Sequence, residues 1–64
     1  MSAWVGPETR STDGESVQVM YCDPVDQVII RVGSARVYLP PASARDLLAG
    51  LAIAVWEADE AGAA

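Results

Sequence analysis

The chain has 64 residues, so it holds one domain. In so small a domain, the free energy gained by burying apolar side chains exceeds the entropy cost of folding by little. Nine acidic residues against four arginines give a net charge of −5, which argues against general affinity for nucleic acid or anionic membrane surfaces. One cysteine and no histidine exclude an intrachain disulfide and a zinc site of the Cys/His type. Association with a second chain is then the remaining way to enlarge the core.

The composition also bears on location. A single cysteine fits a reducing interior better than a secreted, disulfide-rich framework. The N-terminus lacks a basic segment followed by an apolar one. The longest uncharged apolar run, residues 47–56, has ten residues, whereas a membrane-spanning helix needs about 20. The sequence therefore predicts a cytoplasmic protein without a membrane partner.

Residues 1–16 combine Gly6, Pro7 and Gly14 with many Ser, Thr, Asp and Glu residues. This composition favours turns and disorder, so we expect a flexible or loosely docked N-terminal arm before a single domain over 17–64. Trp4 complicates this interpretation, because a tryptophan in a tail either packs back on its domain or contacts a partner. Packing back is the interpretation that we favour.

Strand-forming residues dominate the next segment. Alternating Val, Ile and Tyr predict strands at about 17–22, 27–32 and 35–39. The segment Asp23-Pro24-Val25-Asp26 supplies the first turn, because proline presets φ and the Asp side chains bond nearby backbone amides.

Gly33-Ser34 is a two-residue loop suited to a type II′ hairpin, and such a loop fixes the register of the two strands beside it. Residues on one face of the hairpin are then wholly apolar and must form the core face. The predicted pairs are Val32 with Ala35, Arg31 with Arg36, Ile30 with Val37, Ile29 with Tyr38, and Val28 with Leu39.

The other face of the hairpin holds the one basic and aromatic group of this acidic chain, formed by Arg31, Arg36 and Tyr38. Such a group can hold an anion or contact a partner. The alternative is an ordinary solvated strand face, since charges on outer strands commonly prevent aggregation.

A helix is predicted over about 41–60. Pro41 fits the first turn of a helix, and the residues that follow are strong helix formers apart from Gly50. An apolar stripe at helical spacing can cover the sheet, and it consists of Ala44, Leu47, Leu48, Leu51, Val55 and Ala58. The predicted fold is therefore α+β, with a three-stranded antiparallel sheet packed on one C-terminal helix.

The opposite side of this helix is apolar too, and a small sheet cannot cover both sides. Three explanations compete: the N-terminal arm folds over it, a second copy covers it, or a different protein does. We favour a symmetric homodimer, because two-fold association is the commonest way for a small protein to gain core. The candidate contact residues are Ala49, Gly50, Ile53 and Trp56.

No catalytic or cofactor-binding pattern is present. Without histidine there is no ready general base near neutral pH, and the glycines match no phosphate-binding motif. Cys22 fits the role of a small apolar filler better than that of a nucleophile. We expect a protein that is not an enzyme and that uses no cofactor, metal or small-molecule substrate.

The segment from Val37-Tyr38-Leu39-Pro40-Pro41 through Ala42-Ser43-Ala44-Arg45-Asp46-Leu47-Leu48-Ala49-Gly50-Leu51, with Trp56-Glu57-Ala58-Asp59 after it, resembles small uncharacterised actinobacterial and actinobacteriophage proteins. In these, a β-hairpin leads into an Ala/Leu/Arg-rich helix with an acidic tail. The resemblance covers residues 28–60, and it departs where Pro40 replaces a frequent Thr cap. It implies no activity, and it favours a phage or bacterial accessory protein.

Taken together, the sequence predicts a non-catalytic protein-interaction module, homodimeric, that binds a host protein. The alternative is a small regulator that contacts nucleic acid through the face bearing Arg31 and Arg36. Steep salt dependence would identify nucleic-acid binding.

Overall fold

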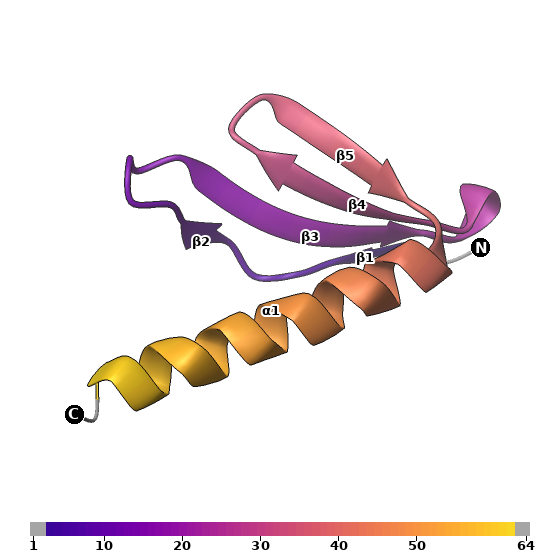
Figure 1. The fold of residues 1–64 in the computed structure, drawn as a ribbon. Helices are drawn as coiled ribbons and strands as arrows, with labels where there is room; N and C mark the ends of the chain where they lie inside the picture. Colours follow the sequence, from indigo (N-terminus) through magenta and orange to yellow (C-terminus); the bar gives the residue numbers. More distant parts are fainter. Residues whose placement is uncertain (1–2, 63–64) are drawn as a thin grey trace.

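Five strands and one helix make up residues 3–62, the part of the chain that the computed structural model describes (Figure 1). The predicted α+β class is confirmed, with an antiparallel sheet followed by one C-terminal helix. The elements are β1 (Ala3–Val5), β2 (Thr9–Arg10), β3 (Ser16–Cys22), a 3₁₀ turn (Asp23–Val25), β4 (Gln27–Val32), β5 (Ala35–Leu39) and α1 (Pro41–Gly62).

The N-terminal segment adds two strands to the three predicted ones. β1 and β2 both pair antiparallel with β3, and the strand order in the sheet is β1-β3-β4-β5, with β2 beside β3. In the segment between β1 and β2, the Gly6 amide donates to the Val19 carbonyl at 2.9 Å. A Cβ at this buried position would lie 2.6 Å from the Trp4 ring and 3.0 Å from the Val19 carbonyl oxygen, so a larger residue than glycine would displace the ring. Residues 1–2 of the predicted arm and 63–64 of the predicted domain lie outside the described residues.

The predicted register of the β4–β5 hairpin is confirmed at all five pairs, from Val32 opposite Ala35 to Val28 opposite Leu39. Gly33 has φ 58, and among residues 3–62 the one non-glycine residue with positive φ is Asp26. Ser34 therefore has a negative φ, as the second position of a type II′ turn requires. The loop thus places Val28, Ile30 and Val32 of β4 on the same face as Ala35, Val37 and Leu39 of β5.

The turn between β3 and β4 is also where the sequence places it. A short 3₁₀ helix spans Asp23–Val25, with proline in its first turn, and Asp26 closes it in the left-handed conformation at φ 50. The Asp26 amide donates to the Asp23 carbonyl at 3.1 Å. Aspartate tolerates this conformation better than most residues, which explains its place here.

The helix lies against the apolar face of the sheet, where it contacts β4 and β5. Figure 1 shows α1 leaving the end of β5 and running obliquely, so that its C-terminal end extends past the strands. From Arg45 to Gly62 every helical residue is exposed. The first turns of α1 therefore dock on the sheet, and the later turns project from it.

The shape is elongated for so short a chain. The radius of gyration is 13.7 Å, whereas a compact chain of this length has about 11 Å. Its extents are 47 × 26 × 16 Å. Among residues 3–62 no hydrophobic side chain is buried, and most of the large ones along α1 are exposed. Over the same residues, α1 does not reach the combination of length and hydropathy that crossing a bilayer requires.

Candidate interaction surfaces

The outer face of α1, like the face toward the groove, is apolar and uncovered. Its two large residues, Ile53 and Trp56, are 62% and 59% exposed. β1 and β2 pair with β3 and leave these side chains exposed, so the N-terminal segment does not cover the outer face of α1 as one explanation from the sequence required. A second copy or a different protein remains as the covering element.

Helical geometry separates the four residues predicted for this contact. At about 100° per residue, Ala49, Ile53 and Trp56 lie within about 60° of one another on one face, whereas Gly50 lies roughly 120° around the helix from Trp56. A Cβ at Gly50 would meet no atom within 4 Å. The small size of Gly50 is thus not required by packing within the chain.

An open apolar groove lies between the helix and the sheet. It has a volume of about 400 Å³ and reaches along α1 as far as Leu51. The groove exists because the helix diverges from the strands and leaves part of the apolar face uncovered. Its large apolar residues are Val19, Val28, Ile30, Leu47, Leu48 and Leu51.

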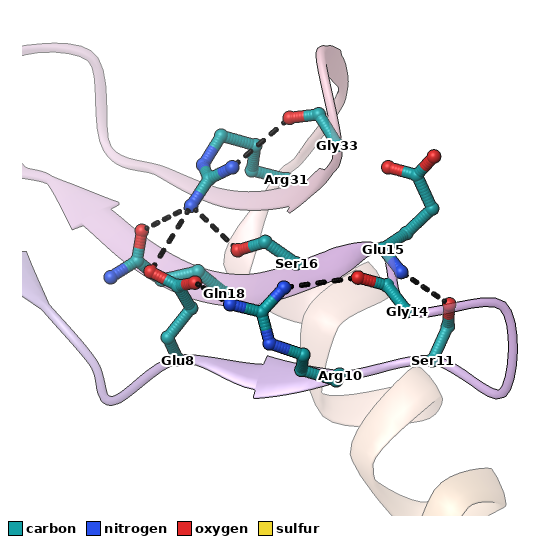
Figure 2. Close-up of polar contacts among 9 residues, drawn as sticks. All are labelled: Glu8, Arg10, Ser11, Gly14, Glu15, Ser16, Gln18, Arg31 and Gly33. Carbon is teal, nitrogen blue, oxygen red and sulfur yellow. Dashed lines mark hydrogen bonds and ion pairs between the residues drawn. The ribbon is translucent and has the colours of Figure 1, made fainter.

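Arg31 of β4 contacts β3, the β4–β5 loop and the segment before β2 on the polar face of the sheet, as Figure 2 shows. Its guanidinium donates to the Gly33 carbonyl at 3.0 Å, to the Ser16 hydroxyl at 3.2 Å and to the Gln18 side-chain oxygen at 2.9 Å. It also lies 4.0 Å from the Glu8 carboxylate, and its side chain is only 22% exposed. The sequence predicted an anion-binding or partner-binding role for Arg31. In the structure, its guanidinium donates hydrogen bonds to groups of the same chain instead.

Arg10 stabilises the neighbouring turn in a similar way. Its Nη1 donates to the Gly14 carbonyl at 3.0 Å, and its Nη2 lies 3.8 Å from the Glu8 carboxylate. Across the same turn, the Glu15 amide donates to the Ser11 hydroxyl at 3.0 Å (Figure 2). These contacts fasten β2 to β3, a strand pair of two residues that has little else to hold it.

The rest of the predicted basic and aromatic face is exposed. Arg36 stands opposite Arg31, and Tyr38 stands opposite Ile29 on the outer strand β5. No hydrogen bond or salt bridge ties Arg36 or Tyr38 to another side chain of residues 3–62. Of the three residues predicted here, Arg36 and Tyr38 are therefore the ones available to a partner.

A tyrosine and two carboxylates meet at the opposite end of β3. The Tyr21 hydroxyl donates to the Asp26 carboxylate at 2.9 Å and to the Asp23 carboxylate at 3.4 Å. The hydrogen bond to Asp26 is the main reason that the pKa of Tyr21 is raised above 10.0, and partial desolvation and the two negative charges act in the same direction. This cluster closes the β3–β4 turn.

Groups that could carry metal or thiol chemistry are few in the described part of the chain. Cys22 is free and half-buried at the end of β3. Residues 3–62 contain no cluster of three or more His, Cys, Asp or Glu side chains that could hold a metal ion. The apolar and charged surfaces of α1 and β5 are thus the features on which a functional argument can be built.

Comparisons of the chain with protein-family models, with curated proteins and with solved structures found no match.

Proposed function

We propose that this protein is a small non-catalytic interaction module that forms a homodimer through the outer face of α1. The observation that carries the proposal is the exposure of Ile53 and Trp56 on a helix that the sheet contacts at one end. Large aromatic residues at such a position are typical of the centre of protein interfaces. A second chain here would supply the burial that the isolated chain lacks.

A second copy is the simplest occupant for this face. Homodimers with two-fold symmetry are the most common assemblies of soluble proteins, and each protomer then contributes the same patch. The remaining exposed group, Arg36 and Tyr38 on β5, would stay free in such a dimer and would contact the partner protein of a phage or bacterial accessory factor.

The hypothesis of nucleic-acid contact receives less support. Arg31 uses its guanidinium for contacts with Gly33, Ser16 and Gln18, so the face offers Arg36 as its one open arginine. A net charge of −5 opposes binding to a polyanion. Weak dependence of partner binding on salt concentration would agree with a protein contact.

Light scattering over a concentration series tests the proposal, with wild type, Trp56→Ala and Val25→Ala compared. Val25 is a control because its side chain is 58% exposed in the β3–β4 turn and does not belong to the outer face of α1. We expect a dimer for wild type and Val25→Ala, and dissociation or loss of helicity for Trp56→Ala. A wild-type monomer at high concentration would refute the homodimer.

A further inference from the structure

We infer that the two copies pair through antiparallel α1 helices, with Arg45 of one copy beside Asp59 and Glu60 of the other, and with Trp56 packed over Ala49. This inference rests on the homodimer proposed above and specifies its geometry. It follows from the order of residues along one strip of the helix, which we call the dimer strip. The strip consists of Arg45, Ala49, Ala52, Ile53, Trp56 and Glu60.

The dimer strip is a continuous band along exposed helix. At 3.6 residues per turn its six members fall within an arc roughly 100° wide. Every one of them is exposed, and the centre of the arc lies roughly 120° from the direction between Leu48 and Leu51, which line the groove beside the sheet. Arg45, at the first end of the strip, also borders this groove. A second helix can therefore lie along the strip from Ala49 onward without displacing the protein's own sheet.

The spacing of residues along the strip is the same in both chain directions. Successive members are 4, 3, 1, 3 and 4 residues apart, so the pattern is symmetric about the midpoint between Ala52 and Ile53. When two copies pair antiparallel about that point, Ala49 meets Trp56, while Ala52 and Ile53 lie beside the two-fold axis, each close to its own counterpart in the second copy. Trp56, the largest side chain of the strip, then faces a small one, which favours close packing of two helices.

The charges at the two ends of the strip select the same direction. Antiparallel pairing places Arg45 beside the acidic end of the partner helix, whereas parallel pairing would place Arg45 beside Arg45 and Trp56 beside Trp56. Like charges in contact oppose a wrong pairing, and opposite charges fix the register. Antiparallel helix dipoles add to this preference.

Arg45 and Glu60 are available for this contact. Within residues 3–62, neither side chain takes part in a salt bridge or side-chain hydrogen bond, in contrast to Arg10 and Arg31. Asp46 lies at the edge of the strip and would approach Glu57 and Glu60 of the second copy. That contact is repulsive, so Asp46→Asn should tighten the dimer by a small factor.

Charge reversal tests the pairing directly. We expect Arg45→Glu and Glu60→Arg each to weaken the dimer about tenfold, because each creates two like-charge contacts. Mixed together, the two variants should form a heterodimer in which both contacts are restored, and the double variant should dimerise like wild type. Arg36→Glu and Asp13→Arg are the controls, since they change net charge by the same amounts at exposed positions outside α1.

Cysteine crosslinking gives a second measurement that does not depend on charge. In a Cys22→Ser background, Ala52→Cys should form a disulfide between copies because residue 52 lies beside the two-fold axis. Ala49→Cys should not, since an antiparallel pair separates the two positions by about 10 Å along the helix, beyond disulfide reach. A parallel pair would crosslink both.

The outcomes separate this inference from the proposed function. A wild-type dimer whose reversed variants show no preference for each other, or which crosslinks through Ala49→Cys, would overturn the antiparallel pairing and leave the homodimer intact. A wild-type monomer would overturn both. Preferential heterodimer formation together with crosslinking through Ala52→Cys is the expected result.

Discussion

The sheet and the helix differ in how far their interactions are satisfied within one chain. In the sheet, every strand has a paired neighbour, and Arg31 of β4 reaches across β3 to the segment before β2. The 22-residue helix has its internal hydrogen bonds, yet from Arg45 onward all of its side chains are exposed. Backbone pairing can thus be satisfied in a chain of 64 residues while apolar burial is not.

We expect substitutions to reduce stability most in the centre of the sheet. Ile30 lies between Val19 and Val37 and lines the groove, so Ile30→Ala removes packing on both sides. We expect a loss of about 2 kcal/mol in the free energy of unfolding, measured by urea denaturation. Val37→Ala on the outer strand is the matched control and should cost less, because Val37 is 51% exposed. Equal losses would mean that the two strands are equally covered.

The polar face should show the next largest effect. Arg31→Met keeps the stem of the side chain and removes three hydrogen bonds, which should cost about 1–2 kcal/mol in a thermal or chemical melt. Arg36→Met is the control, and as a surface change it should stay within about 0.5 kcal/mol. Similar losses for the two variants would show that Arg31 does not hold the strands together.

A glycine substitution examines the helix itself. Gly50→Ala should raise the stability of α1 by up to about 1 kcal/mol, because alanine is the better helix former and a Cβ at this position meets nothing within 4 Å. Circular dichroism melts and light scattering measure stability and association together. If the variant is more helical yet dissociates, Gly50 belongs to the contact with the second copy, as the sequence alone suggested.

The smallest expected effect is a change of folding stability with pH. The folded state raises the pKa of Tyr21 above 10.0, so it stabilises the neutral phenol. This contribution is fully present below pH 10 and is lost as the pH rises through the raised pKa of the folded state. Ultraviolet titration in a Tyr38→Phe background isolates Tyr21, since the chain has two tyrosines.

Asp26→Asn should move that titration back toward the ordinary value, because it removes the carboxylate that accepts the Tyr21 hydroxyl. Asparagine also tolerates the left-handed conformation of Asp26, so the turn itself should persist. A titration unchanged in this variant would show that Asp26 does not hold the phenol proton.

Much of the sheet could be predicted because its signals are local. The Gly33-Ser34 loop determined which residues of β4 and β5 face each other, and the Asp23–Asp26 turn defined the ends of β3 and β4. β1 and β2 escaped prediction for the opposite reason. Their residues are few and lie on either side of a Gly-Pro step, and they become strands because β3 offers an open edge.

For the candidate interaction surfaces, too, local features could be predicted and long-range contacts could not. Helical periodicity predicted that Ile53 and Trp56 share a face, and the structure leaves both exposed. The engagement of Arg31 could not be predicted, because its partners Ser16 and Gln18 lie 15 and 13 residues away and the Glu8 carboxylate comes from the segment before β2. A long-range hydrogen bond of this kind requires knowledge of which strand edges meet.

Pro40 is the single residue between β5 and α1, and it has a consequence for any dimer that the helices form. Proline restricts its own φ and the residue before it, so the sheet and the helix are joined without a flexible linker. In a two-fold pair of helices, the Arg36 and Tyr38 groups of both copies would be displayed at a fixed separation. Such a bivalent display binds a repetitive or dimeric target with avidity that one chain cannot reach.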